Sequence, residues 1–135
     1  MSILIVDDDR ALRQYLVDLL AAEGYATKTA ENGRQAWALL RRKASQPCLI
    51  LLDMEMPTID GWELLKRLKL DATLARIQIV LISAHPDIRD IARRNFDGSI
   101  IFLPKPINPA RLIELAQQFC QRRNPRPSPS ERAAS

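Results

Sequence analysis

The sequence predicts an α/β fold, namely a doubly wound, five-stranded parallel sheet covered by helices on both faces. Short apolar runs alternate five times with amphipathic stretches, which is the pattern of repeated βα units. Three of these runs (ILIV, LILL and IVLI) are almost continuously apolar, as central strands buried on both faces of a parallel sheet are. A chain of 135 residues is long enough to bury a core as one domain without disulfides or metals.

The apolar runs define the strands in order. We expect strands at residues 2–6, 26–29, 49–52, 77–82 and 100–103. The second run, ATKT, contains fewer apolar residues than the others. We therefore place this strand at an edge of the sheet.

Amphipathic stretches between the strands predict five helices. Apolar residues at helical spacing, with Gly24 as a stop signal, predict the first helix over residues 10–23. The later helices are expected at 33–43, 61–69, 87–94 and 109–121. The last begins with Asn108 as N-cap and Pro109 at the first helical position. Right-handed crossovers between successive strands then produce the doubly wound arrangement.

Composition argues against several other classes of protein. Cys48 and Cys120 show neither a disulfide framework nor paired metal-ligand spacing, and we expect both to be small buried hydrophobic residues. No run approaches 18 apolar residues, and the N-terminus lacks the features of a signal peptide. We therefore expect a cytoplasmic protein with no membrane association.

The net charge of +4 comes from the C-terminal tail. Residues 1–121 hold 16 Lys and Arg against 15 Asp and Glu, whereas residues 122–135 hold 4 against 1. The tail is rich in proline and serine and has almost no bulky apolar side chains, so we expect a domain over 1–121 followed by a disordered tail over 122–135. Arginines on a flexible tail give only salt-sensitive attraction to nucleic acid, so no specific nucleic-acid binding is expected.

Polar side chains follow four of the predicted strands where each strand ends. In an open α/β sheet the functional crevice lies beyond the carboxyl ends of the strands. The residues placed there are Asp7, Asp8 and Asp9 after the first strand, Asp53 after the third, Ser83 and Ala84 after the fourth, and Lys105 after the fifth. Gathered carboxylates repel one another without a cation, so the cluster favours a divalent ion, and Mg²⁺ prefers carboxylates, waters and a phosphate oxygen. Asp9, in contrast, is expected to cap the first helix.

These residue types at one sheet edge suit phosphoryl transfer. A carboxylate such as Asp53 can act as the nucleophile and form an aspartyl phosphate. Ser83 can offer its hydroxyl to one phosphoryl oxygen, and Lys105 can place its ammonium beside another.

The chain resembles the receiver domain of two-component response regulators over residues 2 to about 121. The likeness rests on Asp7 and Asp8, the LLDMEMPTIDG block with Asp53, Pro57 and Gly61, the Ile-Ser-Ala end of the fourth strand, and the FLPKP segment with Phe102 and Lys105. The resemblance implies a flavodoxin-like (βα)5 fold with strand order 2-1-3-4-5.

The resemblance also implies a role for each carboxylate at the site. Asp53 would be the phosphoacceptor. Asp8 and Asp53 would bind Mg²⁺ directly, Asp7 mainly through water, and Glu55 through its backbone carbonyl. The partners implied are a sensor histidine kinase or phosphotransfer protein and a downstream protein target, with the receiver acting as a monomer or a phosphorylation-dependent dimer.

Ser83 and Phe102 match the family's switch pair, in which the hydroxyl moves toward the phosphoryl group and the aromatic ring rotates inward. This would reshape the surface formed by the fourth helix, the fifth strand and the fifth helix. The sequence departs from the family in having Phe102 rather than Tyr, and NFDGS at 95–99 where Gly-Ala is common. Glu55 and His85 flank the site, and we hypothesise that they tune the lifetime of the acyl phosphate.

Other functions fit parts of the sequence. A phosphatase that forms an aspartyl phosphate would also use Asp53, but no cap insertion or substrate-binding loop is visible. An unphosphorylated pseudo-receiver is disfavoured because all the expected pocket residues are present. A receiver cut from a longer regulator remains an alternative to the expected stand-alone receiver, which assists its own phosphorylation and dephosphorylation and is not a turnover enzyme.

Removal of residues 122–135 is expected to leave nucleic-acid binding at physiological salt unchanged, because the basic tail supplies only weak, screened attraction. Filter binding of the full chain and the truncated chain measures this. Tail-dependent binding that persists at physiological salt would contradict the prediction.

Overall fold

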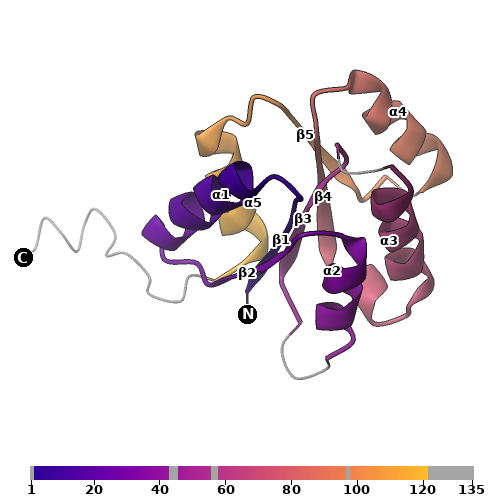
Figure 1. Ribbon diagram of the computed structural model, residues 1–135, viewed down its shortest axis with the longest axis horizontal. Coiled ribbons are helices and arrows are strands. Elements are labelled where there is room, and N and C mark those ends of the chain that lie inside the picture. The colour runs from indigo at the N-terminus through magenta and orange to yellow at the C-terminus, as the bar shows by residue number, and fades with distance from the viewer. Residues whose placement is uncertain (1, 43–45, 56–57, 97, 122–135) are drawn as a thin grey trace, which may run out of the picture.

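The computed structural model describes residues 2–42, 46–55, 58–96 and 98–121, and it contains a five-stranded sheet between two layers of helices (Figure 1). The strands are β1 (Ile3–Val6), β2 (Thr27–Ala30), β3 (Leu49–Asp53), β4 (Gln78–Ser83) and β5 (Ile101–Pro104). Their order is β2-β1-β3-β4-β5, and every neighbouring pair is parallel. The predicted fold class, strand order and edge position of the second strand are confirmed.

The helices agree with the predicted ones except near their ends. They are α1 (Arg10–Ala22), α2 (Gly33–Leu40), α3 (Thr58–Leu70), α4 (Pro86–Asn95) and α5 (Pro109–Phe119), with a short 3-10 helix, η1, at Leu74–Arg76. α2 ends at Leu40, short of the predicted end at residue 43, which lies outside the described residues, as does the tail 122–135. Among the described residues, no helix is long and apolar enough to cross a bilayer.

Local signals in the sequence explain where two of the helices begin and one ends. The Asp9 carboxylate accepts hydrogen bonds from the backbone N–H groups of Ala11 and Leu12, and it caps α1 as predicted. Asn108 caps α5 in the same way, with Pro109 directly after it. Gly24 follows the end of α1 with a φ of 89°, a conformation that glycine adopts without a steric cost.

The two faces of the sheet carry separate cores, because alternate residues of a strand point to opposite faces. One core lies beneath α2, α3 and α4 and includes the strand residues Leu4, Val6, Ile50, Leu52, Ile79 and Leu81. The other lies beneath α1 and α5 and includes Ile3, Ile5, Leu49, Leu51, Val80 and Ile82. Figure 1 shows this division, with α1 and α5 on one side of the sheet and α2, α3 and α4 on the other. Polar groups are therefore confined to the ends of the central strands.

The prediction for the cysteines was wrong, because Cys48 and Cys120 form a disulfide. They are 72 residues apart in the sequence, yet their Cα atoms lie 5.5 Å apart. Cys48 directly precedes β3, and Cys120 directly follows α5. Residues of β3, α1 and α5 belong to the same core, on one face of the sheet. The bond therefore depends on how α5 packs on the sheet, which the spacing of two cysteines does not reveal.

Reduction of this disulfide is expected to lower the free energy of unfolding by about 2–4 kcal/mol, because the bond closes a long loop in the unfolded chain. Urea denaturation with and without a thiol reductant measures the change. The variant Cys48→Ala with Cys120→Ala is the control and should not respond to reductant. An identical response of both proteins would contradict the prediction.

Candidate functional site

Asp53 and Lys105 form an ion pair at the carboxyl edge of the sheet. Asp53 is the last residue of β3 and is 2% exposed, and its Oδ2 lies 3.0 Å from Nζ of Lys105. Its Oδ1 accepts a hydrogen bond of 2.8 Å from the backbone N–H of Glu55. Burial acts to lower the pKa of Lys105, but the hydrogen bond and charge of Asp53 outweigh it, so this pKa is raised. The lysine therefore stays charged, and the carboxylate is held by both oxygens.

The backbone brings Lys105 to this position. β5 lies beside β4, and the backbone N–H of Lys105 donates to the carbonyl of Ser83 at 3.0 Å. β4 lies in turn beside β3, so Asp53 and Ser83, which end their strands, and Lys105, which directly follows β5, lie at the ends of three adjacent strands. The Lys105–Pro106 peptide bond is cis.

Asp7 is a second buried carboxyl group at this edge. It follows β1, is 1% exposed, and accepts a 2.8 Å hydrogen bond from the backbone N–H of Asp9 through Oδ1. Its Oδ2 is buried and has no hydrogen-bond partner among the described residues. Burial raises the pKa of Asp7 to about 7, and the neighbouring charge of Asp53 adds to the increase, while the hydrogen bond from Asp9 opposes it.

The donor set fits a divalent, oxygen-seeking cation. Two buried carboxyl groups, Asp7 and Asp53, face one ammonium, and the unpartnered Oδ2 of Asp7 is an oxygen that such an ion could satisfy. No group of three or more His, Cys, Asp or Glu side chains able to hold a metal occurs in the part of the chain that the structure describes. An ion there would complete its ligands with waters, a backbone carbonyl or a phosphate oxygen, as Mg²⁺ does. Asp8 is exposed.

Glu55 connects the loop after β3 to the loop after β4. Its Oε1 accepts hydrogen bonds from the backbone N–H of Ala84 at 2.5 Å and from Oγ of Ser83 at 3.2 Å. Nε2 of His85 lies 3.9 Å from the same oxygen. The hydrogen bond from Ala84 is the main cause that lowers the pKa of Glu55. The carboxylate is therefore held in its ionised form against two hydrogen-bond donors.

Ser83 and Phe102 line one hollow. This hollow has a volume of about 500 Å³ and lies between α4 and β5, with Arg89, Arg93 and Pro104 among its lining residues. Ser83 is fully buried, and the partly buried ring of Phe102 packs against the core beneath α4. Both residues of the predicted switch pair therefore line the same hollow.

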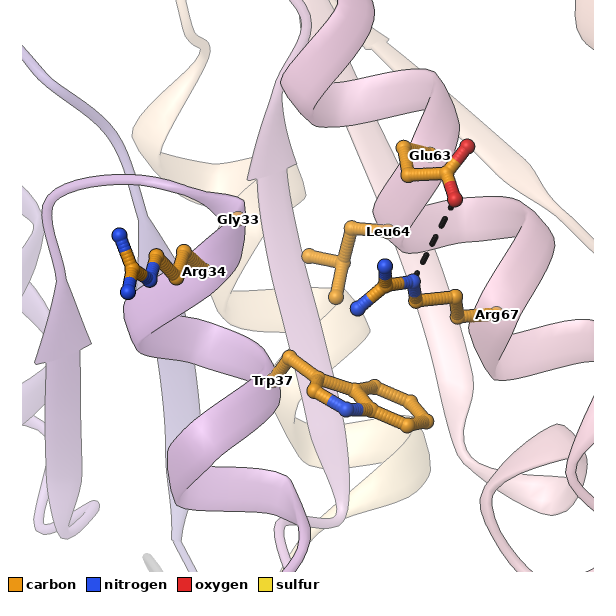
Figure 2. Close-up of a pocket in the computed structure, with 6 residues that line it drawn as sticks. All are labelled: Gly33, Arg34, Trp37, Glu63, Leu64 and Arg67. Carbon is orange, nitrogen blue, oxygen red and sulfur yellow. Dashed lines mark hydrogen bonds and ion pairs between the residues drawn. The ribbon is translucent and has the colours of Figure 1, made fainter.

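A separate cavity of about 280 Å³ lies between α2 and α3, as Figure 2 shows. The guanidinium of Arg67 lies 5.7 Å from the ring centroid of Trp37, and its Nε lies 3.4 Å from Oε1 of Glu63. The residues that line this cavity come from α2 and α3 rather than from the ends of strands. The cavity contains none of the predicted site residues and is distinct from the carboxylate site.

The structure brings together most of the predicted site residues and adds two groups that the sequence did not reveal. The backbone N–H of Ala84 is a donor at the site, and a backbone group carries no side-chain signal. Nη1 of Arg13 donates to the backbone carbonyl of Asp7 at 2.7 Å and thereby fixes the loop after β1. The position of Arg13, one turn into α1, is the sequence feature that could have predicted this contact, because the first turn of the helix must pack beside the loop after β1.

Comparison with known proteins gives one consistent result. A family model described as the response regulator receiver domain matches residues 3–117. A 14.6 kDa protein from the sodA1 3′ region of Leptolyngbya boryana is 36% identical over 89% of this chain and 90% of its own length. The polar-differentiation response regulator DivK of Brucella anthropi is 33% identical over 87% and 94%. The structure of chemotaxis protein CheY4 from Vibrio cholerae superposes with a TM-score of 0.75 at 27% identity, covering 87% of this chain and 97% of that one.

Replacing the buried carboxyl group, Asp7→Asn, is expected to stabilise the protein at pH 8 by about 1–3 kcal/mol, because it removes a buried, partly unsatisfied charge. The pKa of Asp7 is raised on folding, so the native state binds more protons than the unfolded state between about pH 4 and 7. The stability of the wild type should therefore fall as pH rises through this range and then level off. Urea denaturation from pH 4 to 8 measures both effects.

The variant Asp9→Asn is the matched control, because asparagine caps helices as well as aspartate and the change in charge is the same. It should keep the wild-type pH dependence. Saturating Mg²⁺ at pH 8 should stabilise the wild type more than the Asp7→Asn variant. Equal pH dependence in the wild type and the Asp7→Asn variant would contradict the assignment of a perturbed carboxyl group to Asp7.

Proposed function

Because the chain belongs to the response regulator receiver family of two-component signalling, we propose that Asp53 accepts a phosphoryl group from a sensor histidine kinase or phosphotransfer protein. The observation that carries this proposal is the pairing of a buried carboxylate, Asp53, with the ammonium of Lys105 at 3.0 Å. Receiver domains are signalling modules, so we do not assign turnover of an external substrate to this chain.

In the proposed reaction, an oxygen of Asp53 forms a bond to the phosphorus of a phosphohistidine donor. The phosphorus–nitrogen bond breaks, and the donor nitrogen keeps the electron pair. The backbone N–H of Glu55 orients the attacking carboxylate, and Lys105 stabilises negative charge on the phosphoryl oxygens as transfer proceeds. The residues of this chain would thus act mainly by positioning the Asp53 carboxylate and by stabilising the negative charge of the phosphoryl group.

Asp8 and Asp53 would hold Mg²⁺ directly, Asp7 mainly through water, and Glu55 through its backbone carbonyl. When bound, the ion supplies positive charge that offsets the two buried carboxylates and the incoming phosphoryl group. The unpartnered Oδ2 of Asp7 supports this part of the proposal.

Ser83 and Phe102 would convert phosphorylation into a change of surface. The Ser83 hydroxyl would turn to a phosphoryl oxygen, and the ring of Phe102 would move within the hollow that both residues line. The surface affected is formed by α4, β5 and α5 and is the proposed docking site of a downstream protein target. Glu55 and His85, which lie beside Ser83, would tune the phosphoryl lifetime.

We place the protein in the cytoplasm, as a monomer or a phosphorylation-dependent dimer, with no specific nucleic-acid ligand. Cytoplasmic thiols are usually kept reduced, so in this compartment the Cys48–Cys120 disulfide would form only transiently.

Incubation with Mg²⁺ and a small acyl-phosphate donor is expected to add the mass of one phosphoryl group, because Asp53 is positioned as the nucleophile. Intact-protein mass spectrometry under conditions that preserve acyl phosphates measures the adduct. It should be absent with EDTA and in the Asp53→Ala variant. The control Asp90→Ala removes an exposed carboxylate of α4 and should be phosphorylated normally. Absence of any adduct in the wild type would favour the pseudo-receiver alternative.

A further inference from the structure

We propose that the Glu55 carboxylate is an internal competitor of the phosphoryl group, and that it occupies the hydrogen-bond donors of Ser83 and Ala84 in the resting protein. Phosphorylation would have to displace it before these donors could bind the phosphoryl oxygens. The inference rests on the proposed function, since it concerns the regulation of the same site, and it gives Glu55 a positioning role rather than a catalytic one.

The geometry at Glu55 is that of a bound anion. Two donors from the loop after β4, the backbone N–H of Ala84 and the hydroxyl of Ser83, converge on one carboxylate oxygen at 2.5 and 3.2 Å. Hydrogen bonds to an ionised acceptor are about twice as strong as neutral ones. Glu55 reaches these donors from the other side of the site, since it lies two residues after Asp53. The carboxylate thus bridges the two loops between which a phosphoryl group on Asp53 would lie.

Competition follows from the number of protons available. A serine hydroxyl has one proton to donate, and the Ser83 proton is used by Glu55 at 3.2 Å. The lone pairs of the same hydroxyl are partly used too, because Oγ accepts the backbone N–H of His85 at 3.0 Å. The N–H of Ala84 likewise has one proton, which Glu55 accepts. Neither group can donate fully to a phosphoryl oxygen until the carboxylate leaves.

Charge acts in the same direction. A phosphoryl group carries a charge of about −1.5 to −2 near neutral pH, so a carboxylate beside it is repelled. His85 offers the displaced carboxylate an alternative partner, because Nε2 lies 3.9 Å away and its side chain is 69% exposed and free to follow. Displacement would therefore move Glu55 outward, away from Ser83.

The contact also reaches the proposed output surface. Ser83 lines the hollow that contains Phe102, so a carboxylate that holds the Ser83 hydroxyl also holds one wall of this hollow in its resting form. Weakening the contact should favour the phosphorylated arrangement. Glu55 would thus oppose activation and shorten the lifetime of the active state.

The first experiment tests the resting contact without Mg²⁺ or phosphate. The amide proton signal of Ala84 in an ¹⁵N-labelled sample reports its hydrogen bond to Glu55, and the Glu55→Gln variant should shift it upfield, as expected when a charged acceptor becomes neutral. The control Glu63→Gln makes the same change on the exposed face of α3 and should leave the Ala84 signal in place. An unchanged Ala84 signal in the Glu55→Gln variant would overturn the inference, whatever the phosphorylation assay shows.

The second experiment measures the competition with beryllium fluoride, a phosphoryl mimic, in the presence of Mg²⁺. Loss of a charge-assisted contact predicts that Glu55→Gln binds the mimic about five- to tenfold more tightly than the wild type. The gain should shrink in a Ser83→Ala background, where one contested donor is missing. Equal affinity in the wild type and Glu55→Gln, or an equal gain in Glu63→Gln, would overturn the inference. Failure of every variant to bind the mimic, with the Ala84 shift present, would instead overturn the proposed function.

Discussion

The burial of the sheet on both faces is the constraint on which the site depends. Strands β1, β3 and β4 carry almost wholly buried side chains, so a polar or charged group has no place along their length. Such groups are tolerated only where the strands end, since there they can find partners or water. Asp7, Asp53 and Ser83 are all found at that boundary, and each is more than nine-tenths buried. The fold thus concentrates its polar chemistry at one edge.

This concentration leaves the edge short of positive charge. Asp53 is paired with Lys105, but Asp7 has one oxygen without a partner and a pKa raised to about 7. The imbalance costs stability in the isolated domain and at the same time makes the edge receptive to a cation. A divalent cation such as Mg²⁺ suits this imbalance, because it brings the missing positive charge with it.

The network around Glu55 connects this chemistry to the rest of the molecule. One carboxylate oxygen holds both donors of the loop after β4, and Ser83 in turn borders the hollow beside Phe102. Each donor has a single proton, so a change of acceptor at Ser83 and Ala84 is a change between two discrete arrangements. The proposed switch requires two arrangements with different acceptors, and in the arrangement observed the acceptor is the Glu55 carboxylate.

The sequence by itself determined the fold class and the residues that end the strands, because hydrophobic periodicity and strand-end positions are local properties, whereas the strand order followed from the resemblance to the receiver family. The helix caps at Asp9 and Asn108 could also be predicted from the sequence, since each depends on contacts within three residues. Only the tertiary structure decided which carboxylate is buried and which exposed, as the contrast of Asp7 and Asp8 shows. It also decided that Cys48 meets Cys120 and that Glu55 meets Ala84, because these contacts join segments that the packing of α5 and the alignment of β3 with β4 bring together.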